Sequence, residues 1–135
     1  MTEPTKLNTA ALAFMGDAVY EVYVRRHVLG TGTSHSDVLH RMAVEYVSAE
    51  GQTKVVRTLM EGELSDEEMS LVRRARNHKA SSSKKTRASR RGSDIITDKL
   101  ATAFEALLGE LYLSNDMGRL EFLINRAFEI IEMEK

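Results

Sequence analysis

The chain has 135 residues, of which 42% are hydrophobic, and this is enough for a single domain with a true core. It contains no cysteine, which excludes disulfide scaffolds and thiolate-bound zinc or iron–sulfur centres. The polar first residues lack the features of a secretion signal, and the longest apolar stretch, 12–24, is interrupted by Asp17 and Glu21. We therefore expect one soluble, cytoplasmic domain over residues 1–135 that does not bind a membrane.

Helical periodicity dominates the chain, and its single proline and eight glycines favour helices over a turn-rich β-sandwich. Ser65 and Glu68 have the spacing of a capping box, in which each side chain bonds the backbone N–H of the other residue. The sequence therefore predicts an all-α fold. Its helices are expected from about Thr9 to Leu29, from near Ser36, after Ser48, after Ser65, from about Thr97 to Leu113 and from near Asp116.

Two acidic residues lie in helices that are otherwise apolar. The first predicted helix is apolar nearly all round, which is typical of a buried helix, and Asp17 lies in its middle between Gly16 and Ala18. Glu105 lies in a second helix of this kind. An ionised carboxylate in the interior costs free energy unless a cation or hydrogen bonds compensate it. Small residues beside both positions permit close helix packing, so we expect Asp17 and Glu105 to converge on one site.

Paired carboxylates of this kind suit a hard divalent cation such as Mg²⁺, for which Mn²⁺ can substitute. The alternative for each carboxylate is a pairing with an arginine or a helix N-terminus. For Glu21, four residues after Asp17, a pairing with Arg25 at i+4 is the favoured interpretation. The chain has no G-x-S-x-G, P-loop or G-x-G-x-x-G motif, so nucleophilic-serine, nucleoside-triphosphate and dinucleotide chemistry are not indicated.

Positive charge is concentrated in one stretch, because nine of the 19 basic residues and none of the 20 acidic residues lie in 73–91. A basic block in a chain of net charge −1 indicates a surface for a polyanion, and a solvated linker is the equal alternative. Residues 79–94 are polar and serine-rich, which predicts a long, flexible basic loop. The basic stretch contains no Phe, Tyr or Trp, so recognition of the shape and backbone of duplex RNA is favoured over base stacking. Its basic residues are Arg73, Arg74, Arg76, Lys79, Lys84, Lys85, Arg87, Arg90 and Arg91.

These motifs resemble those of a known family. The segment LAFMGDAVYE at 12–21 resembles the signature helix of the ribonuclease III catalytic domain, and TAFEALLGELYL at 102–113 resembles its second acidic helix. The segment RARNHKA at 74–80 and the helices between these two segments are also similar to that domain, so the resemblance extends over essentially the whole chain. Because the sequence ends at Lys135, we expect no C-terminal double-stranded-RNA-binding domain, and in this the chain is similar to the Mini-III branch.

The resemblance implies an all-α, ribonuclease III-like bundle of six to seven helices that forms a homodimer. The signature helices of two copies would pack together, and duplex RNA would lie across their interface. It also implies Mg²⁺-dependent hydrolysis of double-stranded RNA to 5′-phosphate and 3′-hydroxyl ends, with maturation of the large-subunit ribosomal RNA precursor as the biological role.

In the family pattern, Asp17 and Glu105 match the essential catalytic, metal-binding residues. The larger family has further acidic residues where this chain has Ala13 and Thr102. Both replacements are similar to the Mini-III pattern, and they leave fewer ligands for a second metal ion. Glu50 is the candidate match for one more acidic residue of the family. The resemblance also implies RNA contacts by Arg76, Asn77, Lys79, Lys84, Lys85 and Arg87.

Two other functions are compatible with the pattern of residues. One is a non-catalytic, dimeric RNA-binding factor in ribosome assembly, which would keep Asp17 and Glu105 for structural reasons alone. The other is a helical module whose basic loop binds an acidic protein. Incubation of the protein with duplex RNA, in Mg²⁺ or in chelator, separates the nuclease from both.

Overall fold

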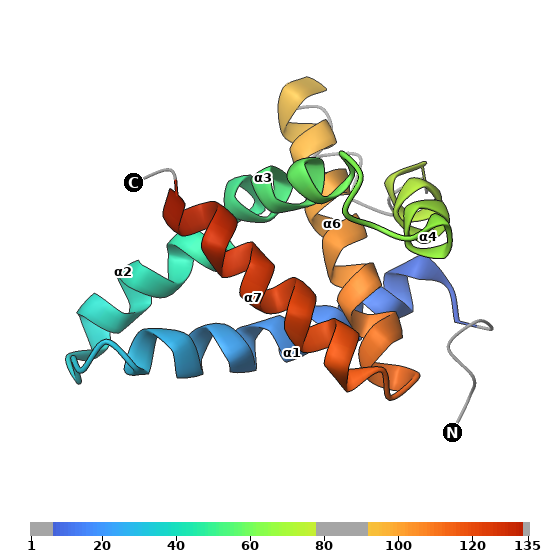
Figure 1. Ribbon diagram of the computed structural model, residues 1–135. Coiled ribbons are helices and arrows are strands. Elements are labelled where there is room, and N and C mark those ends of the chain that lie inside the picture. The colour runs from blue at the N-terminus through green and yellow to red at the C-terminus, as the bar shows by residue number, and fades with distance from the viewer. Residues whose placement is uncertain (1–6, 78–91, 134–135) are drawn as a thin grey trace.

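The computed structural model describes residues 7–77 and 92–133, and in these residues it contains helices and no strand (Figure 1). The prediction of an all-α fold is confirmed. The helices are α1 (Thr9–Leu29), α2 (Ser36–Val47), α3 (Ala49–Leu59), α4 (Asp66–Asn77), α6 (Gly92–Leu113) and α7 (Met117–Met133).

Side-chain caps define the start of several helices, as the sequence indicates. Asn8 Oδ1 accepts a hydrogen bond of 2.8 Å from the Ala11 backbone N–H at the start of α1. Before α4, the Ser65 N–H donates to Glu68 Oε1 at 2.8 Å and the Glu68 N–H donates to Ser65 Oγ at 3.1 Å. The capping box is therefore confirmed, and it fixes the position at which α4 begins.

Two glycines allow α1 and α6 to cross in direct backbone contact (Figure 1). A Cβ atom on Gly16 would overlap the carbonyl oxygen of Glu105, and a Cβ atom on Gly109 would overlap that of Leu12. No other residue type fits at this crossing without moving one helix. The crossing determines which parts of α1 and α6 lie side by side.

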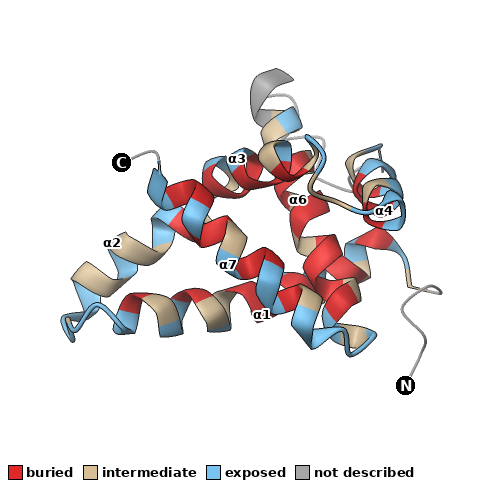
Figure 2. Ribbon diagram, viewed as in Figure 1, coloured by how far each residue is buried: buried red, intermediate tan, exposed pale blue. Residues whose placement is uncertain are grey.

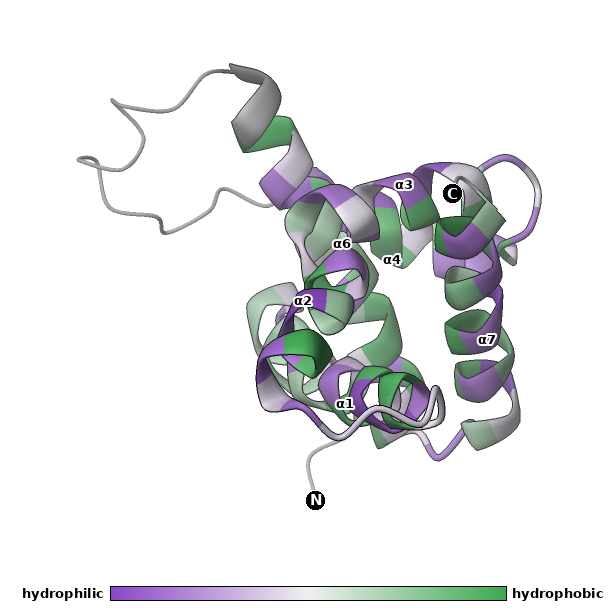
Figure 3. Ribbon diagram, turned by 90° about the vertical axis from the view of Figure 1, so that its left-hand side faces the viewer, coloured by the Kyte–Doolittle hydropathy of each residue, from purple (hydrophilic) through white to green (hydrophobic). Residues whose placement is uncertain are grey.

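The remaining helices pack around α1 and α6 and close the core (Figure 2). The Tyr20 ring of α1 packs edge-on against Phe104 of α6, with ring centroids 5.2 Å apart, and it also stacks against Phe128 of α7 at 6.3 Å. Along α7, apolar and polar residues alternate in the manner of an amphipathic helix (Figure 3). Its buried face consists of Leu120, Leu123, Ile124, Ala127, Phe128, Ile130 and Ile131.

Two expectations about these elements are wrong. Helix α6 begins at Gly92 rather than near Thr97, so the end of the expected 79–94 loop is helical. Ile95, in this first part of the helix, is half-buried. Helix α1 is also not buried all round, because Phe14 is 82% exposed and Val22 is 64% exposed in the single chain. The neighbouring helices cover only part of the surface of α1, so its remaining apolar side faces outward.

In the part of the chain that the structure describes, no helix combines the length and the apolar character needed to cross a bilayer. The rest of the expected basic loop, residues 78–91, lies outside the described residues.

Candidate active site

The crossing of α1 and α6 brings the two acidic residues together. Asp17 follows Gly16 in α1, and Glu105 precedes Gly109 by four residues, so it lies one turn away on the same face of α6. Because the glycines are in contact, the two carboxylates lie close enough to hydrogen bond and to repel each other. The structure therefore brings Asp17 and Glu105 together, as the sequence predicts.

The carboxyl group of Glu105 is half-buried, and its pKa is raised to about 7 from an ordinary value of 4.5. Burial is the largest cause, because it disfavours the charged form, and the negative charge of Asp17 raises the pKa further. A hydrogen bond from Gln52 acts in the opposite direction. At neutral pH, Glu105 is therefore poised between its charged and neutral forms.

Asp17 is exposed, and the expectation that it lies in an apolar interior is wrong. Successive residues of a helix are about 100° apart, so Gly16 faces α6 directly and Asp17 lies at the edge of the contact. From that edge its carboxylate reaches Glu105 and also meets solvent. The site is therefore open on the side of α1 and enclosed on the side of α6, which is suitable for a bound ligand that enters from outside.

Among the described residues, neither Asp17 nor Glu105 has the arginine or lysine partner that the sequence left open as an alternative. Glu21 does, because Arg25 Nε lies 3.1 Å from Glu21 Oε2, and the favoured interpretation of Glu21 is confirmed. Asp17 and Glu105 thus form an oxygen-donor pair without a basic partner in the described chain, and this fits a divalent metal ion.

Gln52 is a residue of this site that sequence reasoning missed. Its side chain is 2% exposed, and its amide Nε2 donates to the Val47 carbonyl at 3.0 Å and to Glu105 Oε2 at 3.3 Å. One signal in the sequence could have found it. Gln52 is the polar member of a helix face that it shares with Val55, Val56 and Leu59, all of them buried.

The other acidic candidate does not join this site. Glu50 is exposed in the first turn of α3. Among the residues that the structure describes, no three or more Asp, Glu, His or Cys side chains gather closely enough to hold a metal ion together. Asp17 and Glu105 are thus a pair without a third acidic member in the described chain.

Two of the residues expected to bind RNA lie at the end of α4. Arg76 is half-buried, Asn77 is exposed, and Arg76 Nε donates to Asn77 Oδ1 at 3.4 Å. Exposed Arg73 and Arg74 add positive charge to the same end of the helix. The other four expected RNA contacts lie outside the described residues, and they are Lys79, Lys84, Lys85 and Arg87.

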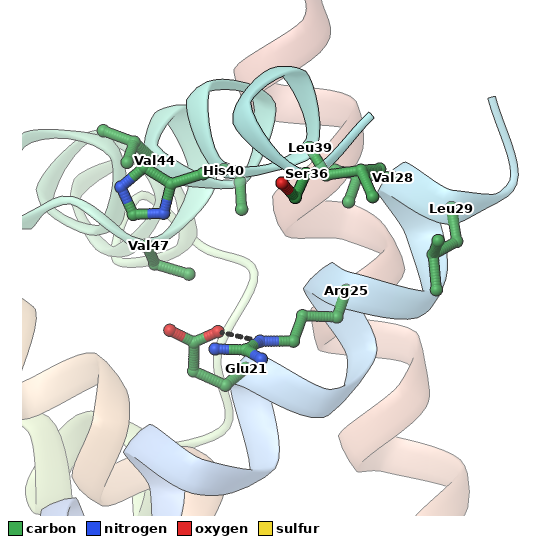
Figure 4. Close-up of a pocket in the computed structure, with 10 residues that line it drawn as sticks. Glu21, Arg25, Val28, Leu29, Ser36, Leu39, His40, Val44 and Val47 are labelled. Atoms are coloured by element: carbon green, nitrogen blue, oxygen red, sulfur yellow. Dashed lines mark hydrogen bonds and ion pairs between the residues drawn. The ribbon is translucent and has the colours of Figure 1, made fainter. Parts of the chain in front are cut away.

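A separate pocket of about 410 Å³ lies between α1 and α2 (Figure 4). Ser36 and His40 of α2 face the Glu21–Arg25 ion pair of α1 across it, and Val28 and Leu39 belong to its apolar wall. Neither Asp17 nor Glu105 lines this pocket. The acidic pair lies instead at the open edge of the helix crossing.

Comparison with known proteins gives consistent matches. Residues 10–116 match the family model described as "Ribonuclease III domain". The chain is 43% identical over 132 residues to a Mini-ribonuclease 3 of Brevibacillus brevis, covering 98% of this chain and 93% of that protein. It is 40% identical to a Mini-ribonuclease 3 of Enterococcus faecalis, with 93% and 91% covered. A crystal structure of a protein from Fusobacterium nucleatum is similar, with a TM-score of 0.79, 25% identity, and 95% and 98% covered.

Proposed function

Because the chain belongs to the ribonuclease III family and is an endoribonuclease, we propose that it hydrolyses double-stranded RNA at the Asp17–Glu105 pair. One observation carries this proposal. The α1–α6 crossing holds two carboxylates together, and the described chain provides neither with a basic partner. A divalent cation would relieve their repulsion, and Mg²⁺ is the proposed ion, with Mn²⁺ as a substitute.

In this proposal Asp17 and Glu105 hold the ion through carboxylate oxygens. The ion, when bound, lowers the pKa of its water and neutralises negative charge on the scissile phosphate. Glu105, whose pKa is raised to about 7 in the chain alone, gives up its proton when the cation binds. Asp17, at the exposed edge, leaves the site accessible to a substrate too large to enter a closed pocket.

The proposed substrate is duplex RNA, and the residues that position its phosphates are Arg76, Asn77, Lys79, Lys84, Lys85 and Arg87. Lysine and arginine contacts to phosphates orient a nucleic acid without reading its bases. The absence of Phe, Tyr and Trp from 73–91 supports recognition by shape. We further propose that the products carry 5′-phosphate and 3′-hydroxyl ends, and that the cytoplasmic substrate is the large-subunit ribosomal RNA precursor.

The working form in this proposal is a homodimer that packs through α1. Phe14, Val22 and Leu29 are 82%, 64% and 55% exposed, and Ala18 lies between the first two on the same face. An exposed apolar stripe of this kind marks an interaction surface. Two copies facing each other along α1 would place two acidic pairs near one duplex, so that each pair cuts one strand.

The dimer is tested with Phe14→Asp, which places a charge at the most exposed residue of the stripe. We expect the wild type to sediment as a dimer and Phe14→Asp as a monomer with an unchanged helical circular-dichroism spectrum. Met133→Asp is the matched control, because Met133 is also exposed but lies at the end of α7. A wild-type chain that sediments as a monomer would contradict the dimer.

The activity is tested by incubating the purified chain with a long RNA duplex in Mg²⁺, in Mn²⁺ and in chelator, and by sequencing the product ends. We expect cleavage in both metals, none in chelator, and 5′-phosphate ends. Duplex RNA that is bound but never cut in any metal would contradict the proposal and favour a non-catalytic RNA-binding factor.

A further inference from the structure

Gln52 links α3 to the candidate active site across the interface of α3 and α6. Its side chain lies in the core, and its amide donates to Glu105 Oε2 at 3.3 Å. Its neighbours on this face of α3 are aliphatic, and burying an amide among them costs free energy unless its polar atoms are bonded. The amide oxygen of Gln52 has no hydrogen-bond partner in the described chain. Its side chain therefore forms hydrogen bonds only through the two amide N–H groups.

The start of α3 holds the Gln52 amide in place. One residue, Ser48, separates α2 from α3, and its hydroxyl caps the new helix by accepting from the Gly51 N–H at 3.1 Å. A Cβ on Gly51 would overlap the Glu45 carbonyl oxygen, so the tight junction requires glycine. The second N–H of the Gln52 amide bonds the Val47 carbonyl in this junction at 3.0 Å. The side-chain amide that donates to Glu105 is therefore held at this junction by a second hydrogen bond.

An amide at this position has an effect that an arginine would not have. It binds one oxygen of the Glu105 carboxylate and restricts its rotation, but it brings no positive charge. A guanidinium in the same place would neutralise Glu105 and remove the attraction for a cation, as happens to Glu68 beside Arg119. Gln52 thus orients the carboxylate and leaves its charge available for a ligand.

We propose that Gln52 is a positioning residue, which holds the Glu105 carboxylate in the orientation that receives a divalent cation together with Asp17. The inference rests on the proposed function, because it concerns the same metal site. It adds a residue that contacts neither RNA nor the cation and acts through Glu105.

The test compares two variants of neighbouring buried residues. Gln52→Met keeps the size of the side chain and removes the donor to Glu105. Thr53→Val is the matched control. Buried Thr53 donates to the Thr97 carbonyl of α6 at 2.9 Å, so the valine variant also loses one hydrogen bond between α3 and α6. Mn²⁺ binding to each RNA-free protein is measured by electron paramagnetic resonance, and thermal unfolding is followed with and without Mn²⁺.

We expect both variants to unfold at a lower temperature than the wild type when no metal is present. Gln52→Met should also bind Mn²⁺ roughly 10- to 100-fold more weakly and lose most of the stabilisation by Mn²⁺, as expected for a partner that orients a ligand. Thr53→Val should bind Mn²⁺ as the wild type does. If Gln52→Met does not fold, Gln52→Asn, whose shorter amide cannot reach Glu105, provides the same comparison.

Equal Mn²⁺ affinity of the Gln52 variant and Thr53→Val would overturn the positioning role, while cleavage by the wild type would leave the proposed function intact. A wild-type chain that neither binds Mn²⁺ nor cleaves RNA would overturn the proposed function, and the positioning role with it.

Discussion

Two groups of acidic side chains in this ribonuclease have opposite electrostatic surroundings. Buried Glu68 accepts two bonds from Arg119, at 2.8 and 2.9 Å, and these bonds are the largest cause of its lowered pKa. Half-buried Glu63 is bonded by Arg126 at 2.7 Å, and its pKa is lowered for the same reason. Glu105 has an acidic neighbour instead of an arginine, and its pKa is raised.

The comparison shows how burial alone misleads. Glu68 has less solvent-accessible surface than Glu105, yet it is the structural one, because Arg119 and the capping box complete its hydrogen bonds. Carboxylates that are matched by arginine within the chain hold helices together, as Glu68 holds α4 to α7. The pair that has no counter-charge among the described residues is the one suited to an external cation.

The largest expected effect comes from removing a carboxylate, either from the Asp17–Glu105 pair or from the arginine-bound group, and comparing the change in cleavage with the change in stability. Glu105→Gln or Asp17→Asn should lower duplex-RNA cleavage roughly 10³-fold, because each removes a charge from the proposed metal site. Neither should reduce the free energy of unfolding, since both remove a repulsion. Cleavage rates from single-turnover digests and urea unfolding curves measure the two quantities.

Glu68→Ala should give the reverse result. It should lower stability by about 2 kcal/mol, because Arg119 loses its partner and α4 loses part of its cap. Cleavage per folded molecule should stay near the wild-type rate. Wild-type cleavage by Asp17→Asn or Glu105→Gln would remove the distinction between the two groups.

The second expected effect is on the geometry that holds the acidic pair. Gly16→Ala should lower stability by about 3 kcal/mol, because the new Cβ meets the Glu105 carbonyl and forces α1 and α6 apart. Metal binding should weaken in the fraction that remains folded. Gly118→Ala in α7 is the control, since a Cβ there has no neighbour within 4 Å, and it should change stability by about 0.5 kcal/mol or less.

Sequence patterns predicted two features that depend on spacing within one helix, and one that depends on the close packing of two helices. The capping box at Ser65 and the Glu21–Arg25 pair follow from spacing within one helix, and both are confirmed. The meeting of Asp17 and Glu105 was predicted because small residues beside them permit close packing.

Features that depend on which helix covers which face were not predictable in this way. The exposure of Asp17 follows from the angle at which α6 crosses α1, which periodicity does not contain. The role of Gln52 follows from the approach of α3 to α6, between residues 53 positions apart in the chain. The start of α6 at Gly92 was missed because a polar, serine-rich composition was interpreted as a loop.

The smallest expected effect concerns pH, and it tests whether Glu105 really differs from the arginine-bound glutamates. Its pKa is about 7 in the folded chain against 4.5 ordinarily, so the folded state binds its proton more tightly than the unfolded state does. The contribution of this group to stability is therefore greatest below pH 4.5 and falls as the pH rises to about 7. Other carboxyl groups titrate too, so the useful quantity is the melting temperature of the wild type minus that of Glu105→Gln.

This difference should become more negative by several degrees, roughly 5 °C, between pH 5 and pH 8 in metal-free buffer. Mg²⁺ at pH 8 should remove most of it, because the cation replaces the proton as the partner of the Asp17–Glu105 pair. Glu21→Gln is the control, since Arg25 already balances that carboxylate, and its difference from the wild type should stay within about 1 °C at each pH. If this difference in melting temperature does not change with pH, Glu105 is charged over the whole range. Glu105 and Glu68 would then differ in their position in the fold and not in their protonation.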